Sequence, residues 1–282
     1  MKVDLCMWTK NGAKTLPIVL ERINKVIPKE QVGEKYIVDD RSHDSTLRIA
    51  NHYGWNVICN KGSGISDGAN TALDLVQTGL FCSFEQDVLL APDWWSKVSP
   101  LILGKPNVAV ACGLRFLPKQ NFCSNVETYE LTRKDTDYPA GYGKTLDNTI
   151  WNTQLLRTVG GFPKLKYAGL DTYLHNRFAA QGYQWLVNYD VKSVHYHTGF
   201  LSELRRYYFY ALSLPQLYNR IGGFSNLYSS DTVGRFLWKL GKSPASAFRM
   251  ALKMDDGRLM AAYPAMRLCW LLGYLRGQNV EA

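Results

Sequence analysis

Few features of this sequence suggest a secreted, fibrous or disordered protein. Its 282 residues include only six cysteines, which form no C-x-x-C pair and show no regular spacing. Several of these cysteines lie in apolar stretches, where a thiol behaves as a small hydrophobic group. We therefore expect reduced, structural cysteines and a cytoplasmic location. Low-complexity tracts and internal repeats are also missing, which favours an ordinary globular chain.

Long uninterrupted apolar runs are missing as well. The first residues, MKVDLCMW, lack a basic region followed by a long apolar core, so we expect no secretory signal. The apolar segment RLMAAYPAMRLCWLLGYLRG (258–277) is interrupted by Pro264 and Arg267. Because a spanning helix needs about 20 predominantly apolar residues, we expect no transmembrane segment there.

The positive charge of the chain is unevenly distributed. The formal net charge is +9, and from Leu201 onward there are eleven Lys and Arg residues against five Asp and Glu. This segment also interleaves aromatics with arginines, as in SELRRYYFYALSLPQLY (202–218), a composition that suits helices in the headgroup region of a membrane. We expect residues 201–282 to form a helical extension that binds the cytoplasmic face of the membrane peripherally. Packing on the rest of the chain, or a dimer contact, would also explain the pattern.

Strand-like and helix-like segments alternate through the first 115 residues. Five segments are predicted as strands: VDLCMW (3–8), EKYIVDD (34–40), WNVICN (55–60), TGLFCSFEQD (78–87) and NVAVACGL (107–114). Between them lie segments with helical apolar spacing, such as TLPIVLERINKVI (15–27). Single helices between strands imply crossover connections, so the pattern predicts an α/β fold with a mostly parallel sheet flanked by helices.

Polar residues follow several of these strands directly. They are Thr9 and Asn11 after the first, Asp39 and Asp40 at the end of the second, Lys61 after the third, and Glu85 and Asp87 at the end of the fourth. Asp and Asn are common in turns, so each residue alone is more simply explained as a turn former. Parallel strands, however, present their carboxyl ends at one edge, where ligands bind. Two acidic pairs at that edge indicate Mg²⁺ or Mn²⁺ carrying a diphosphate.

Five motifs then resemble the family 2 glycosyltransferases, which have a GT-A type fold that binds nucleotide-diphosphosugars. The motifs are IVDDRSHDST (37–46), GISDGANTALDLV (64–76), FEQD (84–87) in the place of the D-x-D metal motif, LLRTVGGF (155–162) and GLDTYLHNRFAAQGY (169–183). Two positions depart from the family pattern: Glu85 replaces the first Asp of D-x-D, and Leu170 replaces an acidic residue. The C-terminal extension resembles the segment that follows the catalytic domain in membrane-associated members.

The resemblance implies an inverting, metal-dependent transfer of a sugar from a UDP- or GDP-sugar to a glycan or a lipid-linked (polyprenyl) acceptor. It implies a GT-A catalytic domain over residues 1–200, with a nucleotide-sugar half (1–115) and an acceptor half (116–200). The nucleotide-sugar would contact Thr9, Asn11, Asp39, Asp40, Lys61, Asp67, Glu85 and Gln86. Asp39 would accept a hydrogen bond from the nucleobase, which leaves UDP and GDP equally open.

Asp171 is the candidate catalytic base, and Asp87 and His195 are the candidate ligands of Mn²⁺ or Mg²⁺. Asp171 opens an amphipathic segment, where an aspartate can also act as an N-cap. An N-cap role is equally open for Asp67. His195 and His197 alternate along one strand and share a face, so either could reach the metal. A phosphate acceptor is already ionised, so Asp171 would orient it and would deprotonate only a hydroxyl acceptor.

Three other functions compete with glycosyl transfer. A sugar-phosphate nucleotidyltransferase would need a loop rich in glycine and arginine after the first strand, and TKNGAKT (9–15) is not one. A pseudo-enzyme that binds nucleotide without transfer stays open because of Glu85 and Leu170. A nucleic-acid partner is disfavoured, because the first 200 residues are nearly neutral and place carboxylates where phosphates would approach.

Overall fold

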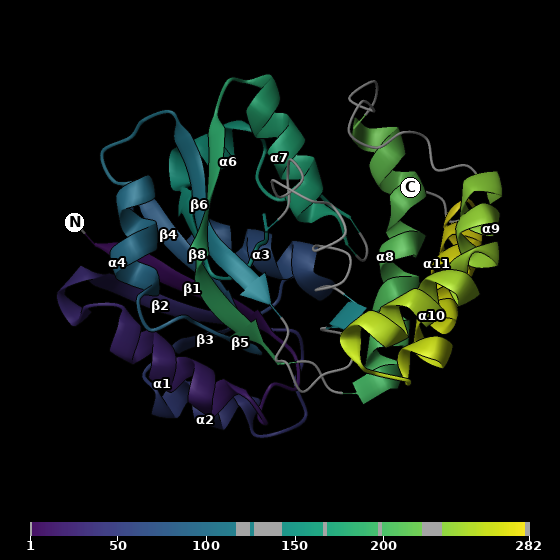
Figure 1. The fold of residues 1–282 in the computed structure, drawn as a ribbon. Coiled ribbons are helices and arrows are strands. Elements are labelled where there is room, and N and C mark those ends of the chain that lie inside the picture. The colour runs from purple at the N-terminus through teal and green to yellow at the C-terminus, as the bar shows by residue number, and fades with distance from the viewer. Residues whose placement is uncertain are drawn as a thin grey trace. The chain divides into compact units, whose positions relative to one another are not determined.

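A computed structural model describes residues 2–116, 125–126, 143–165, 168–196, 199–221 and 233–279 of the chain (Figure 1). The chain divides into two compact units. The first, which we call the sheet unit, comprises Met1–Phe116, Gly141–Lys166 and Leu170–Tyr196. The second, the helical unit, comprises Leu117–Ala140, Tyr167–Gly169 and His197–Ala282.

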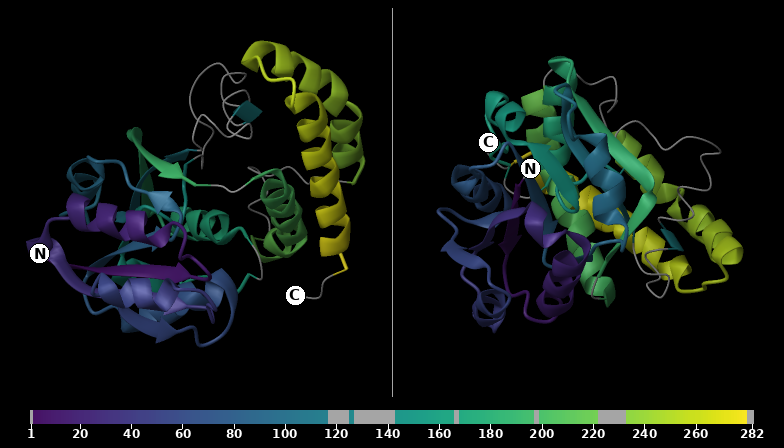
Figure 2. Two further views of the ribbon diagram at one scale, coloured as in Figure 1. Left: turned by 90° about the horizontal axis from the view of Figure 1, so that it is seen from below. Right: turned by 90° about the vertical axis from the view of Figure 1, so that its left-hand side faces the viewer.

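The sheet unit is built on one mixed, eight-stranded sheet with the order β3-β2-β1-β4-β7-β6-β8-β5 (Figures 1 and 2). Its strands are β1 (Val3–Thr9), β2 (Val32–Asp39), β3 (Asn56–Cys59), β4 (Leu80–Glu85), β5 (Val88–Leu89), β6 (Val108–Phe116), β7 (Thr149–Asn152) and β8 (Gln184–His195). The pairs β1–β2, β2–β3, β1–β4 and β6–β8 are parallel, whereas β7 pairs antiparallel with β4 and β6, and β5 with β8. The predicted α/β architecture with a mostly parallel sheet is confirmed.

Helices connect and cover the strands of this sheet. They are α1 (Leu16–Val26), α2 (Thr46–His52), α3 (Gly64–Leu75), α4 (Trp94–Val98), α6 (Thr153–Thr158) and α7 (Leu170–Ala180), with short 3₁₀ turns at Lys29–Gln31 and Ser99–Leu101. In α1 the apolar residues recur at helical spacing, and Leu16, Leu20 and Ile23 are buried in the core under the sheet. Burial of this stripe fixes α1 against the strands that it connects.

The chain reverses its direction of travel across the sheet between β3 and β4. It runs outward from β1 through β2 to β3 and then returns to place β4 on the other side of β1. The register aligns Thr9 with Asp39 across β1 and β2, and Trp8 with Glu85 across β1 and β4. The carboxyl ends of these three strands therefore form one edge at a topological switch point, the place where α/β sheets bind ligands.

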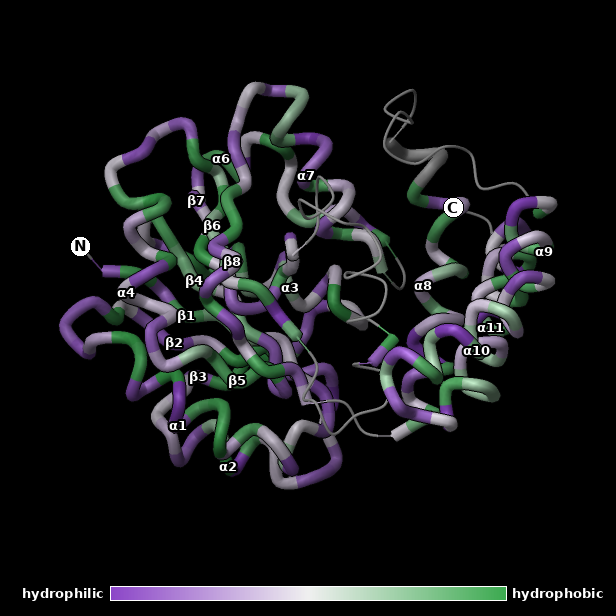
Figure 3. Tube along the Cα trace, viewed as in Figure 1, coloured by the Kyte–Doolittle hydropathy of each residue, from purple (hydrophilic) through white to green (hydrophobic). Residues whose placement is uncertain are grey.

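The helical unit contains α8 (Gly199–Ile221), α9 (Val233–Gly241), α10 (Ser243–Met254) and α11 (Leu259–Gly277). Small residues let α8 and α11 approach closely, since a Cβ added at Gly273 would lie 2.2 Å from the carbonyl oxygen of Tyr208. Figure 3 shows both apolar and polar stretches on these helices. Among the described helices, none combines the length and the apolar character needed to cross a membrane.

Candidate active site

A pocket of about 290 Å³ opens at the carboxyl ends of β1, β2 and β4. Its walls are Trp8, Thr9, Lys10, Val38, Asp40, Asn60, Gly64, Ile65, Glu85, Gln86 and Asp87. Residues from four separate stretches of sequence therefore meet in one cavity. The structure brings Thr9, Asp40, Glu85 and Asp87 together there, as the strand-end pattern predicts, and adds Gln86, which only the family resemblance had indicated.

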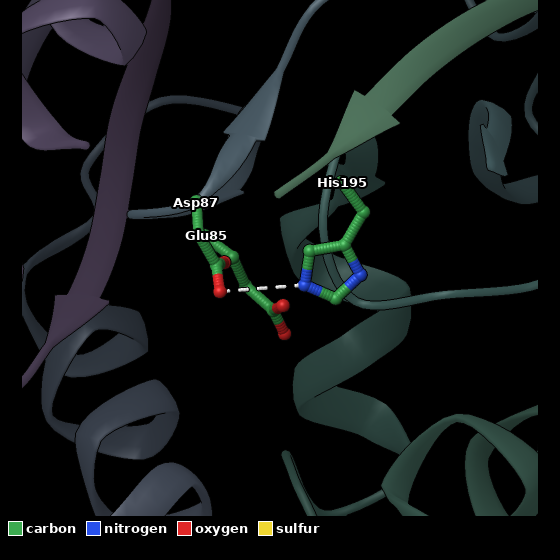
Figure 4. Close-up of side chains that lie close together, drawn as sticks. All are labelled: Glu85, Asp87 and His195. Carbon is green, nitrogen blue, oxygen red and sulfur yellow. Dashed lines mark ion pairs between the residues drawn. The ribbon is translucent and has the colours of Figure 1, made fainter. Parts of the chain in front are cut away.

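The shortest strand of the sheet explains why a histidine distant in sequence joins these acids. Immediately after Asp87, the strand β5 pairs antiparallel with the end of β8, so that Val88 lies opposite His195. The amide of Tyr196 donates to the carbonyl oxygen of Asp87 (2.8 Å), which extends the pairing by one bond. The Nε2 atom of His195 consequently lies 3.4 Å from Oδ2 of Asp87 (Figure 4).

Glu85, Asp87 and His195 form a cluster with the composition of a metal site (Figure 4). Each residue offers one ligand atom, and these atoms all lie within 4.8 Å of one another. His195 is buried, whereas the side chains of Glu85 and Asp87 are 22% and 33% exposed, so the cluster is open on the carboxylate side. Two carboxylates and an imidazole are suitable ligands for a divalent cation.

The charges around Glu85 are strongly unbalanced. Burial raises the pKa of its carboxyl group well above the ordinary value, and the negative charges of Asp147, Asp87 and Asp171 raise it further, against the lowering effect of Arg115. The Arg115 guanidinium lies 3.9 Å from Glu85 and 2.7 Å from Asp147. Burial and the repulsion among these carboxylates outweigh the attraction of Arg115, which favours the protonated form of Glu85.

Asp171 lies at the start of α7 and belongs to this same group of charges. The buried residues Leu170, Leu174 and Phe178 recur four apart on α7 and anchor it to the sheet unit. The Asp171 carboxylate accepts a hydrogen bond from the amide of Thr172 (2.7 Å). Burial raises its pKa, an effect that the Thr172 amide and Arg115 only partly offset.

The loop after β1 is tied to the loop after β2 through Asn11 and Ser42. Asn11 has a positive φ of 51°, and its amide donates to Oγ of Ser42 (2.7 Å), while its side-chain oxygen accepts from the amide of His43 (2.9 Å). Asp39, which is 5% exposed, accepts from both the amide and the hydroxyl of Ser42. Asn11 and Asp39 therefore hold these two loops together next to the pocket, but neither residue lines it.

Asp40 reaches into the pocket and is surrounded by cations. Its carboxylate lies 3.3 Å from Nζ of Lys10 and 3.1 Å from Nη1 of Arg41, and it accepts from the amide of Gly64 (3.2 Å). Burial raises its pKa, but the Gly64 amide, Lys10 and Arg41 outweigh that effect and lower it. Asp40 is accordingly held as a carboxylate, with two basic side chains beside the pocket.

Gln86, between the two acids, holds the first loop in place. Its Oε1 atom accepts from the hydroxyl of Thr9 and from the amide of Lys10, and its Nε2 atom donates to the Lys10 carbonyl (3.1 Å). A Cβ added at Gly12 would lie 2.5 Å from Oε1 of Gln86, so the loop needs a residue without a side chain there.

The structure places Lys61 and Asp67 outside the lining of the pocket. The Nζ atom of Lys61 lies 2.6 Å from Asp74 in an exposed ion pair. Asp67 accepts from the amide of Ser63 (2.9 Å) at the start of α3, which is a capping interaction. His197 lies outside the described residues, and only His195 can be placed.

Sequence reasoning missed two residues of this charge cluster, Arg115 and Asp147. Arg115 follows the apolar part of β6, so the rule that selected the other strand-end residues would have found it. Asp147 precedes β7, a four-residue strand without a clear sequence signal, and its side chain is fully buried. Its position at the site depends on the antiparallel pairing of β7 with β4 and β6.

Comparisons with solved structures support the fold. A mannosyltransferase from Pyrobaculum calidifontis, PcManGT, in complex with GDP-Man and Mn²⁺, matches 97% of this chain and 87% of its own, with a TM-score of 0.67 and 16% identity. TarS from S. aureus with UDP-GlcNAc matches 99% and 92% (TM-score 0.54, 14% identity). Glucosyl-3-phosphoglycerate synthase from Mycobacterium tuberculosis, with Mn²⁺, UDP and product, matches 77% and 79% (TM-score 0.53, 16% identity).

The sequence comparisons identify the family directly. A search among curated proteins gives no match to this sequence. The family model described as Glycosyl transferase family 2 matches residues 4–160, which is more than half of the chain and includes the strand-end acids. This protein therefore belongs to glycosyl transferase family 2 and has a GT-A fold.

Proposed function

We propose that this protein is an inverting, metal-dependent glycosyltransferase that uses a UDP- or GDP-sugar as donor. The observation that carries the proposal is the Glu85–Asp87–His195 cluster, which lies at the pocket formed by the strand ends. Family membership supports glycosyl transfer. The complexes of PcManGT with GDP-Man and of TarS with UDP-GlcNAc support a nucleotide-sugar donor.

The donor atoms of the cluster suit Mn²⁺ or Mg²⁺. Asp87 and His195 would hold the cation directly, and Glu85 would bind it or a water in its coordination sphere. The raised pKa of the partly buried Glu85 carboxyl supports a cationic ligand, because burial and the repulsion from Asp147, Asp87 and Asp171 outweigh the attraction of Arg115. When bound, the cation would neutralise the negative charge that develops on the departing diphosphate.

Other residues in and next to the pocket lining would orient the nucleotide. Asp39 would accept from the imide or amide edge of the base, since each carboxylate oxygen that serves Ser42 has a second lone pair. Thr9 and Asn11 would shape the nucleotide side of the pocket. Asp40 would accept from a ribose hydroxyl, and Lys10 beside it would be available to a phosphate.

Asp171 would act on the acceptor. A carboxylate whose pKa is raised by burial is a stronger base than an ordinary aspartate, which suits removal of the proton from an attacking hydroxyl. With a phosphate acceptor, Asp171 would orient the nucleophile instead. The position of Asp171 near Arg115 and Glu85, inferred from their electrostatic coupling, supports attack on the sugar carbon beside the metal cluster.

We further propose that the sheet unit is catalytic and that the helical unit binds the surface of an anionic membrane, so that a lipid-linked acceptor can reach the site. On α9 and α10 the exposed apolar residues are Leu237 (52%), Trp238 (59%), Phe248 (54%) and Leu252 (69%), interspersed with Lys239, Lys242, Arg249 and Lys253. Apolar and basic side chains together match the chemistry of an anionic lipid surface. Leu252→Asp should abolish cosedimentation with anionic vesicles, and retained cosedimentation would refute the membrane proposal.

A donor-hydrolysis screen tests the proposed function. The protein is incubated with a panel of UDP- and GDP-sugars, with Mn²⁺, with Mg²⁺ and with chelator. We expect release of one nucleoside diphosphate that depends on metal and is lost in Asp87→Asn. Asp93→Asn is the matched control, because Asp93 lies outside the pocket lining and its side chain, 42% exposed, pairs with Lys97 on α4. Equal release by wild type and Asp87→Asn would refute the metal-dependent mechanism.

A further inference from the structure

His175 on α7, one helical turn beyond Asp171, forms a polar pair with Lys144. The Nζ atom of Lys144 lies 2.5 Å from Nε2 of His175, and both side chains are about half-buried. His175 follows Asp171 by four residues, so the two side chains share one face of α7. Lys144, the other member of the pair, lies in the segment that precedes β7.

The protonation states of this pair follow from its surroundings. Burial lowers the pKa of His175 to about 4, and the positive charge of Lys144 contributes in the same direction. Burial also lowers the pKa of Lys144, against a small opposing effect of the buried Cys112 thiol. At neutral pH the imidazole is therefore neutral, and its Nε2 atom accepts from the lysine ammonium. The remaining polar groups, the other ammonium protons and the Nδ1–H of His175, are all donors.

Lys144 differs from Arg115 and Lys10, which lie beside the pocket acids. Arg115 pairs with Asp147, and Lys10 pairs with Asp40. Lys35, which is also partly buried, donates to the carbonyl oxygen of Tyr53. Within the described ranges, Lys144 has no carboxylate at ion-pair distance, and its side chain contacts the uncharged imidazole of His175. A half-buried ammonium group that contacts only a neutral partner would be stabilised by an anion.

We propose that Lys144 and His175 form an anion-binding subsite for an acidic group, phosphate or carboxylate, on the acceptor. This inference rests on the proposed function, because it places the acceptor on the face of α7 that carries Asp171. Four residues of helix rise by about 6 Å. The acidic group would thus lie about one helical turn from the acceptor oxygen that attacks the sugar. An acceptor of this class is a sugar phosphate, a phosphorylated or carboxylated small alcohol, or a lipid phosphate.

A purely structural role for the pair predicts different behaviour. A hydrogen bond that only ties the segment before β7 to α7 would be insensitive to added anions at constant ionic strength. An anion subsite predicts saturable binding that depends on the charge of Lys144. The two roles are therefore separated by titrating the metal-free protein with inorganic phosphate and, in a second series, with acetate.

The imidazole resonances of histidine-labelled protein report on the subsite directly. The chain has five histidines, and the His175 signal is assigned by its absence in His175→Gln. We expect phosphate, acetate or both to shift this signal saturably at constant ionic strength, and the stronger ligand identifies the acidic group. Lys144→Met should weaken the binding about tenfold or more, the usual scale for a lost hydrogen bond to a charged group. Lys144→Arg should retain it.

The control variant is Lys105→Met, which removes an exposed lysine from the same unit and should bind as the wild type does. If neither anion shifts the His175 signal saturably, or if Lys144→Met binds as tightly as Lys105→Met, the subsite is refuted. The titration needs neither donor nor turnover. If the protein binds no anion, the donor-hydrolysis experiment still tests the proposed function. If the wild type hydrolyses no donor, the titration still tests the anion subsite.

Discussion

The raised pKa of Glu85 leads to the prediction that this residue destabilises the metal-free protein. Its partly buried carboxylate is repelled by Asp147, Asp87 and Asp171, and the Arg115 guanidinium lies 3.9 Å away. The folded state therefore binds a proton at Glu85 more tightly than the unfolded chain does. The penalty is fully present above the raised folded-state pKa and disappears as the pH falls towards the unfolded value.

Glu85→Gln removes this charge and keeps the size of the side chain. In chelator at neutral pH we expect the variant to be more stable than the wild type by about 0.5–2 kcal/mol, the usual gain from relieving a single unfavourable feature. This gain corresponds to a rise in Tm of about 1–4 °C for a chain of this size. Saturating Mn²⁺ should reverse the order, because a ligand at 100 times its Kd stabilises the wild type by about 2.7 kcal/mol and the variant by less.

Thermal unfolding followed by circular dichroism, in chelator and in Mn²⁺, measures both effects. Glu30→Gln is the matched control, since Glu30 is exposed and the same change there should leave both Tm values unaltered. Lowering the pH should raise the stability of the chelated wild type relative to Glu85→Gln. A Glu85→Gln variant that is less stable than wild type in chelator would contradict the electrostatic reasoning.

Three further changes test other parts of the site. Asp171→Asn should lower kcat with a hydroxyl acceptor by about 10²–10⁴-fold and leave nucleotide affinity in calorimetry unchanged, and an unaltered kcat would contradict the base assignment. His195→Gln should weaken Mn²⁺ binding at least about tenfold, whereas His52→Gln, at an exposed histidine, should not. Gly62→Ala would place a Cβ 2.0 Å from the Asp67 carboxylate, which accepts from the Ser63 amide at the start of α3. It should lower the free energy of unfolding by about 1 kcal/mol. In an Asp67→Ala background the same change should cause little further loss of stability.

The part of the fold that sequence reasoning predicted is the part fixed by local pattern. Strands β1, β2, β3, β4 and β6 overlap the predicted segments, because apolar runs alternate there with segments of helical apolar spacing. Strands β5 and β7 lie outside this alternation, and their pairing is antiparallel and long-range. Strands of this kind are defined by hydrogen bonds to a neighbour that is distant in sequence, so no local pattern predicts them.

The same division applies to the site. The strand-end rule predicts that Asp40, Glu85 and Asp87 meet at one edge, and they line a single pocket. Whether Lys61 enters that pocket depends on its side chain, which extends to Asp74 on α3. His195 approaches Asp87 because β5 pairs with β8. The sequence alone left two candidates for the metal-binding histidine, His195 and His197.

The central claim is that Asp87 and His195 hold a divalent cation through which the nucleotide diphosphate binds. Isothermal titration calorimetry of UDP and of GDP, each with Mn²⁺ and with chelator, tests it on wild type and on Asp87→Asn. We expect one nucleotide to bind the wild type only in the presence of Mn²⁺, and we expect Mn²⁺ not to strengthen its binding to Asp87→Asn. Nucleotide binding of equal strength with and without Mn²⁺, or no binding under either condition, would contradict it.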